Sequence, residues 1–97
     1  MTPRIADIQA SVCKHFALSR EDLLSRDRCQ RIARPRLIAM HLTRRLTIKS
    51  FPQIGRAFER DHSSVIYADN EIKRLRKVDP ELNDDIRAIV ADLGAEA

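Results

Sequence analysis

Four prolines divide this chain into segments with a helical spacing of apolar residues, and this pattern most constrains the fold. Proline is tolerated in the first turn of a helix, where its missing N–H costs little. Each proline stands near the start of a segment in which apolar residues recur every three or four positions: Pro3, Pro35, Pro52 and Pro80. Aromatic residues make up only 4% of the chain, so the core must come mainly from Ile, Leu, Val and Ala, which favours helices. The sequence therefore predicts an all-α protein.

Capping signals set the expected bounds of the helices. Ser19 and Ser50 each precede an acid or amide by three residues, as in a capping box, while Thr2 and Asp61 are placed as N-caps of two longer helices. Gly94 has the position of a C′ residue. The expected helices are 3–16, 19–24, 35–46, 50–58, 61–77 and 80–93, with a basic loop at 25–31. We expect a single domain over residues 1–97, a compact bundle of five to six helices.

Length and composition exclude several classes of protein. A chain of 97 residues can form only one modest core. This excludes a two-domain enzyme with an enclosed cofactor site. No apolar run reaches the roughly 18 residues of a membrane span, and no signal peptide is present, so we expect a cytoplasmic protein. Cys13 and Cys29 lack the spacing and partners of a metal site. We expect no metal, no cofactor and, since no nucleophile–base set is present, no enzyme.

The positive charge gathers in the middle of the chain. Net charge is +1 over residues 1–30, +6 over 31–64 and −3 over 65–97. The middle stretch includes a short predicted helix, a tight turn and the start of a longer helix, and the second helix of such a helix-turn-helix fits a DNA major groove about 12 Å wide. A solvated surface would explain the charge alone, whereas charge and helix pair together favour DNA. Four apolar residues are expected to pack the junction of the two helices: Ile54, Phe58, Val65 and Ala68.

Two stretches carry a resemblance to a known family. Residues 22–47 read DLLSRDRCQRIARPRLIAMHLTRRLT, and residues 50–68 read SFPQIGRAFERDHSSVIYA. The ARPR before an apolar helix is moderately specific, and IG-x-x-F followed by RDH-S/T-S/T-V is highly specific. Nearly the whole chain resembles the C-terminal DNA-binding domain of the bacterial replication initiator DnaA. The resemblance implies a helix-turn-helix that binds double-stranded, A/T-rich DnaA boxes of the TTATCCACA type and acts at the nucleoid.

The resemblance also implies which residues meet DNA. Base contacts are implied for Arg28 in the minor groove and for five residues in the major groove: Arg60, Asp61, His62, Ser63 and Ser64. A guanidinium can donate to a guanine edge, a carboxylate can accept from a base amino group, and a narrow A/T-rich minor groove attracts arginine. Contacts with phosphates, which position a protein without reading sequence, are expected from Arg34, Arg36, Arg44, Arg45, Lys49 and Ser50.

Three sites depart from the family pattern. Most members have Gly-Gly-Arg-Asp-His after the phenylalanine, whereas this chain has Phe58-Glu59-Arg60-Asp61-His62, one residue shorter and without glycine. The turn must therefore differ, and the charge of Glu59 should weaken DNA binding. Serines at 63 and 64 replace two threonines and remove a methyl that could pack on thymine. Asp27 lowers the charge of the loop.

Two functions follow from these residues. The first is a regulator that reads DnaA-box-like sites and modulates replication initiation or transcription. The alternative is a protein-interaction module that acts on DnaA or its regulators and binds DNA non-specifically. No G-x-x-x-x-G-K-[ST] phosphate loop is present, so the chain is not expected to open an origin by itself. Met1 and the compact ends predict a small stand-alone protein, with an excised domain as the alternative; the oligomeric state stays open.

Overall fold

The computed structural model describes residues 2–95, and within this range it contains six helices and no strand. The helices are α1 (Ile5–Phe16), α2 (Arg20–Leu24), α3 (Gln30–Leu46), α4 (Phe51–Ala57), α5 (His62–Arg76) and α6 (Pro80–Asp92). The predicted all-α fold is confirmed. The ends of the predicted domain, residues 1 and 96–97, lie outside the described residues. Between residues 2 and 95, no helix is long and apolar enough to cross a bilayer.

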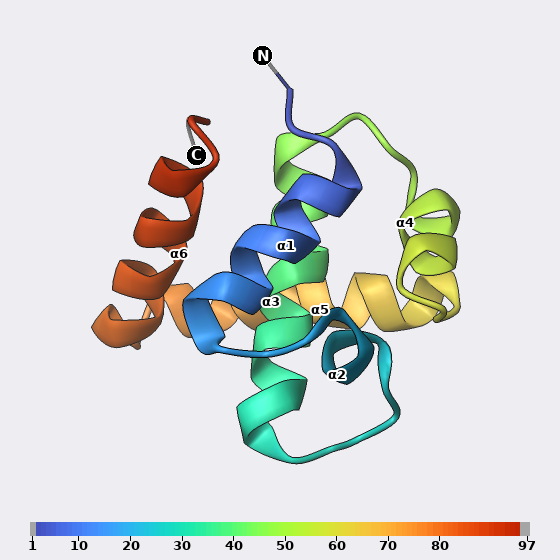
Figure 1. Cartoon of the computed structure of the whole chain (residues 1–97), viewed down its shortest axis with the longest axis horizontal. Helices are drawn as coiled ribbons and strands as arrows, with labels where there is room; N and C mark the ends of the chain where they lie inside the picture. The colour runs from blue at the N-terminus through green and yellow to red at the C-terminus, as the bar shows by residue number, and fades with distance from the viewer. Residues whose placement is uncertain (1, 96–97) are drawn as a thin grey trace.

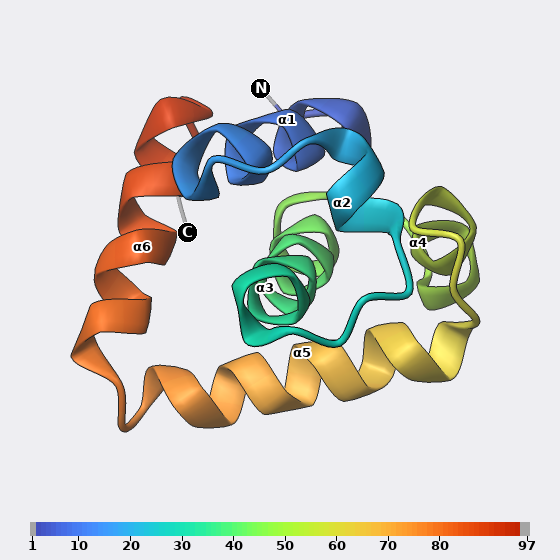
Figure 2. The ribbon, with the colours of Figure 1, turned by 60° about the horizontal axis from the view of Figure 1, so that its bottom comes forward.

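Helix α3 lies at the centre of the fold. Figures 1 and 2 show the other helices arranged around it, with α6 at one side. Helix α3 packs against α1, α2, α4 and α5, whereas α6 packs against α1 and α5. Nine of the 17 residues of α3 are buried, so the helix is enclosed on most sides rather than along one stripe. The core is therefore built around α3.

The predicted caps of three helices are confirmed. Ser19, Ser50 and Asp61 each accept a hydrogen bond from the backbone N–H three residues later, at 3.0, 3.3 and 3.1 Å respectively. Gly94 follows α6 with φ 67°, the left-handed conformation that ends many helices. The cap predicted at Thr2 is wrong, because α1 begins at Ile5 and the Asp7 carboxylate accepts from the Arg4 N–H at 3.2 Å.

Helix α3 begins at Gln30 and not, as predicted, at Pro35. The carbonyl of Cys29 accepts a bond from the N–H of Ala33 at 2.7 Å, which closes the first turn. This earlier start buries Ile32 in the core, and the apolar burial outweighs the lost N–H bond at Pro35. The basic loop is consequently shorter than predicted and spans residues 25–29.

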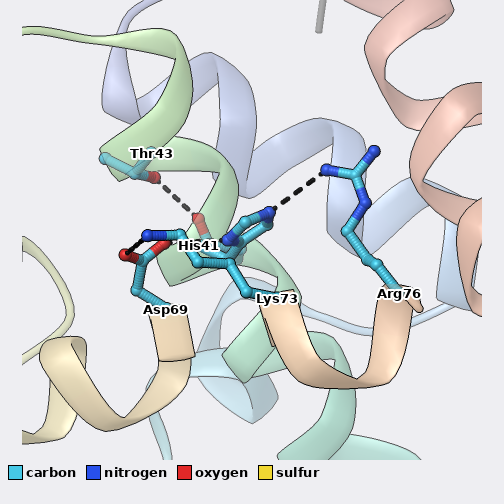
Figure 3. Close-up of polar contacts among 6 residues, drawn as sticks. His41, Thr43, Asp69, Lys73 and Arg76 are labelled. Atoms are coloured by element: carbon cyan, nitrogen blue, oxygen red, sulfur yellow. Dashed lines mark hydrogen bonds and ion pairs between the residues drawn. The ribbon is translucent and has the colours of Figure 1, made fainter. Parts of the chain in front are cut away.

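A cluster of polar side chains is buried between α3 and α5. His41 is 1% exposed and Asp69 is 5% exposed, and His41 Nδ1 lies 2.9 Å from Asp69 Oδ1. Figure 3 shows Lys73 beside Asp69, and Arg76 on the other side of the imidazole. The Lys73 ammonium lies 3.0 Å from Asp69 Oδ2, and the Arg76 guanidinium lies 3.3 Å from His41 Nε2. Because Arg76 has only donors, Nε2 must accept and Nδ1 carries the proton that Asp69 accepts.

This arrangement stabilises a neutral imidazole beside a carboxylate. Burial lowers the pKa of His41, more than the hydrogen bond and charge of Asp69 raise it. Burial alone would raise the pKa of Asp69, but hydrogen bonds from Lys73 and His41 lower it on balance. The pair therefore joins α3 to α5 through a charge-assisted bond within the core.

The pH dependence of stability tests this arrangement. Because the folded protein lowers the pKa of His41, the unfolded chain takes up the proton first, and the free energy of unfolding falls as the pH drops below about 6.5. The loss is at most about 1.4 kcal/mol per pH unit. Stability from Asp69 is present above its ordinary pKa of 3.8 and is lost only at lower pH.

Urea denaturation between about pH 7.5 and about pH 5 measures the effect. The variant His41→Asn retains a donor for Asp69 but does not titrate, so we expect a flatter dependence on pH. His62→Asn, which removes an exposed histidine, is the control and should keep the dependence of the native chain. Equal slopes in the native chain and His41→Asn would contradict the assignment.

Candidate nucleic-acid interface

The turn between α4 and α5 is tight and is built on a buried apolar junction. Four side chains of this junction are fully buried, as predicted: Ile54, Phe58, Val65 and Ala68. The Gly55 carbonyl accepts from the Arg60 N–H at 2.8 Å. A Cβ at Gly55 would lie 2.6 Å from the Arg60 carbonyl oxygen, so only glycine allows the turn to approach α4 this closely.

Glu59 adopts a left-handed backbone conformation that glycine adopts more readily than other residues. Its φ is 56°, in the left-handed region, which costs a non-glycine residue roughly 1 kcal/mol. The Glu59 carbonyl lies within 3.5 Å of the Arg26 guanidinium and 3.3 Å of the Arg60 guanidinium. The turn therefore contains one left-handed non-glycine residue, and the exposed Glu59 carboxylate belongs to a residue whose carbonyl is bonded by Arg26 and Arg60.

The N-terminus of α5 presents a small set of polar groups to solvent. Asp61 Oδ1 accepts from Ser63 Oγ at 2.7 Å and from Ser64 N at 3.1 Å, which leaves Oδ2 outside these bonds. The hydrogen bonds from Ser63 and then Ser64 lower the pKa of Asp61, so the carboxylate stays ionised. His62 is exposed at the first position of the helix. Four predicted base-contact residues are thus adjacent at the start of α5.

The basic loop, residues 25–29, lies beside the turn. Arg26 donates to the Glu59 carbonyl, and Arg60 donates to the carbonyls of Leu24, at 3.4 Å, and of Ser25. Arg28 is exposed in this loop. The structure therefore places the loop of Arg28 next to the α4–α5 turn, although the two segments are far apart in sequence.

Two residues that were predicted to contact DNA, Arg60 and Arg36, form hydrogen bonds within the protein instead. The Arg60 guanidinium lies against carbonyls of α2, the loop and its own turn, so a base contact would require it to release them. Arg36 is 7% exposed and donates to the Leu23 carbonyl at 2.7 Å and to the Asp27 carbonyl at 3.1 Å. Burial on this scale does not fit the expected phosphate contact, and we leave Arg36 out of the proposed contact surface.

Three predicted phosphate contacts lie together where α3 ends and α4 begins. The Arg44 guanidinium donates to the Lys49 carbonyl at 3.0 Å and lies 4.4 Å from the centre of the Phe51 ring. Ser50 follows Lys49 and caps α4. The side chains of Arg44 and Lys49 are exposed, so this end of α4 offers two cations and a helix N-terminus to solvent.

The other two predicted phosphate contacts lie toward the opposite end of α5. Arg34 forms an ion pair at 3.3 Å with Asp79, which follows α5. Burial lowers the pKa of Arg76 in the last turn of α5, and the nearby charge of Arg45 lowers it further. Arg34 lies near the start of α3 and is thus separated from Arg44, Lys49 and Ser50 at its other end, whereas Arg45 follows Arg44 in the last turn of α3.

Tyr67 is a surface residue that the sequence analysis missed. It is 60% exposed on α5 and stands one helical turn after Ser63. A shallow hollow of about 310 Å³ is lined by Arg36, Leu37, Met40, Arg60, Ser63, Ser64 and Tyr67. The four-residue spacing from Ser63 is the signal that could have placed Tyr67 on this face.

A short helix, a tight turn and a longer helix with an exposed N-terminus define a helix-turn-helix domain. The sequence pattern of the bacterial DnaA protein helix-turn-helix family matches residues 5–72. The chain is 46% identical over 96 residues to the chromosomal replication initiator protein DnaA of Sphingopyxis alaskensis, covering 96% of this chain and 21% of that protein. It is 45% identical over 87 residues to the protein of that name from Rhizobium meliloti, covering 89% of this chain and 18% of that protein.

The chain belongs to the bacterial DnaA helix-turn-helix family. A third relative, from Zymomonas mobilis, is 42% identical over 87 residues, which are 89% of this chain and 18% of that protein. The chain spans about a fifth of the length of these relatives. Membership in this family assigns the chain a DNA-binding helix-turn-helix domain.

Substitution of Glu59 separates backbone strain from charge. Glu59→Gly should raise the free energy of unfolding by about 1 kcal/mol, because glycine adopts positive φ without a Cβ clash. The same variant should bind every DNA duplex more tightly, because a carboxylate near phosphates is removed. Thermal unfolding and fluorescence anisotropy measure the two effects.

Glu59→Gln is the matched control for this variant. It removes the charge but keeps the Cβ, so DNA binding should tighten without the gain in stability. A stabilised Glu59→Gln would contradict the assignment of strain to φ, and unchanged DNA binding in both variants would place Glu59 away from phosphates.

Proposed function

We propose that this chain binds double-stranded DNA at A/T-rich, DnaA-box-like sites and thereby modulates replication initiation or transcription. The observation that supports this proposal most strongly is the exposed N-terminus of α5 next to a basic loop, in a chain that belongs to the DnaA helix-turn-helix family. In this proposal α5 enters the major groove and the loop enters the adjacent minor groove.

The polar groups at the start of α5 have chemistry suited to base edges. The free Asp61 Oδ2 can accept from a cytosine or adenine amino group, and the exposed His62 can donate or accept. The hydroxyls of Ser63 and Ser64 bond to Asp61 Oδ1, and their oxygens can still accept from DNA. We therefore propose these four residues as the major-groove contacts.

Arg28 is the proposed minor-groove contact. A narrow A/T-rich minor groove has an enhanced negative potential, which attracts an exposed guanidinium. Arg28 is exposed on a loop whose position is set by hydrogen bonds to the α4–α5 turn. These observations support a protein that contacts the major and the minor groove of DNA at the same time.

The proposed phosphate contacts are Arg44, Lys49 and Ser50. Their exposure and the cap at the start of α4 suit a backbone phosphate, which helix N-termini and cations bind. Arg34 and Arg45 are proposed as outer phosphate contacts at the far end of α5. Such contacts add affinity and salt dependence without base preference.

In this proposal the chain occupies the boxes that an initiator also binds, and regulation follows from competition for those sites. The alternative is a module that contacts DnaA or a DnaA regulator and binds DNA without preference. Equal binding to a box duplex and a scrambled duplex would favour that alternative.

Fluorescence anisotropy with a box duplex and its scrambled counterpart tests the proposal. We expect binding to the box to be tighter by about tenfold or more, roughly 1.4 kcal/mol, at near-physiological salt. His62→Ala should lose about 1–3 kcal/mol on the box and little on the scrambled duplex, whereas Lys49→Ala should weaken both and reduce the salt slope by about one. Equal losses on both duplexes for both variants would contradict the base-contact assignment.

A further inference from the structure

The carbonyls of Leu23 and Leu24 at the end of α2 accept hydrogen bonds from other parts of the fold, whereas the Asp22 carbonyl already accepts from Ser25 N at 3.1 Å and from Ser25 Oγ at 2.8 Å. The last four carbonyls of an α-helix have no partner within the helix. Helix α2 has only five residues and no basic residue in its last turn. Its end is also half-buried, so water cannot satisfy all of these oxygens.

Arg36 supplies donors from α3. Its Nε donates to the Leu23 carbonyl at 2.7 Å, and its two terminal nitrogens lie 3.4 Å from the Asp22 carbonyl and 3.1 Å from the Asp27 carbonyl. One guanidinium therefore bonds to α2 and to the middle of the basic loop. A planar fork of donors can reach such separated acceptors at once, whereas a lysine ammonium is a point charge.

Arg60 supplies donors from the α4–α5 turn. Its guanidinium donates to the carbonyls of Leu24 and Ser25 and, at 3.2 Å, to the carbonyl of Phe58 in its own turn. Arg60 thus joins the start of the basic loop to the α4–α5 turn. Together, Arg36 and Arg60 attach the segment that contains Arg28 to α3 and to the turn that precedes α5.

We propose that Arg36 and Arg60 are positioning residues for DNA reading: they hold the basic loop at a set distance from the N-terminus of α5, so that the loop and α5 reach adjacent grooves together. This inference rests on the proposed function. It differs from the expected phosphate and base contacts of these two arginines, because each acts here through the loop. Base preference then depends on two residues that need not touch a base.

Conservative replacement separates positioning from direct contact with DNA. Arg36→Lys keeps the positive charge but loses the planar fork, so a direct phosphate contact would survive and the positioning role would not. We expect Arg36→Lys to bind the box duplex roughly tenfold more weakly, because this is the loss expected when Arg28 no longer contacts DNA. Binding to the scrambled duplex should change by less than about twofold. Arg87→Lys, on α6 and paired with Asp84 at 3.2 Å, is the control outside the proposed contact surface and should change neither.

A double-mutant cycle tests the route through Arg28. Arg28→Ala should weaken box binding in the native chain by roughly tenfold. In an Arg36→Lys background it should weaken binding by less than about threefold, because the loop is already displaced. Additive losses would overturn the proposal.

Loop mobility provides a measurement that does not depend on DNA. Backbone amide order parameters from NMR relaxation should fall at residues 26–28 in Arg36→Lys, while those of α3 and α5 stay near the native values. Arg60→Lys, at a half-buried position, provides a second variant if Arg36→Lys does not fold, and the same fall is expected. Unchanged order parameters in the loop would overturn the proposal.

These results also distinguish the two proposals from each other. If the native chain binds both duplexes equally, the proposed function fails, while a mobile loop in Arg36→Lys would still support the positioning of the loop. If the native chain prefers the box and Arg36→Lys keeps both that preference and an ordered loop, the proposed function stands and the positioning role is overturned.

Discussion

The enclosure of α3 is the constraint on which the rest of the structure depends. Because other helices pack on most sides of α3, its buried polar side chains must find partners inside the protein. Arg36 bonds to the end of α2 and the basic loop, and His41 bonds to Asp69 of α5. Burying such groups without partners would cost several kcal/mol each. The same helix therefore sets the positions of the loop and of α5, the two parts that we propose meet DNA.

Much of the fold could be predicted because its local signals agree. The caps at Ser19, Ser50 and Asp61 and the C′ glycine at 94 all stand where the spacing of apolar residues also begins or ends a helix. The start of α3 differs from the prediction because Pro35 is a local signal of a helix start, whereas the burial of Ile32 extends the helix to Gln30. That burial is a tertiary effect, which a proline pattern does not contain.

The candidate site could be predicted in part. The motif located the turn and the start of α5, and the structure confirms that Ile54, Phe58, Val65 and Ala68 form the buried junction. The sequence could not predict that the Arg36 and Arg60 side chains donate to carbonyls of the protein. Whether a guanidinium meets a phosphate or a carbonyl depends on acceptors in another segment, and Ser25 and Arg60 are 35 residues apart in sequence. The positive φ of Glu59 could not be predicted either, because the sequence shows only that the turn lacks a glycine.

A chemical probe placed on the basic loop would test most directly whether the loop enters the minor groove while α5 reads the major groove. Cys29 is exposed at the end of this loop, whereas Cys13 is buried, so an iron chelate can be attached to Cys29 and its strand cleavage mapped on a duplex with one DnaA box. The proposed arrangement of loop and α5 predicts cleavage confined to one end of the box, with the offset between strands that marks the minor groove. Cleavage spread evenly along the duplex, or centred on the major groove, would contradict it.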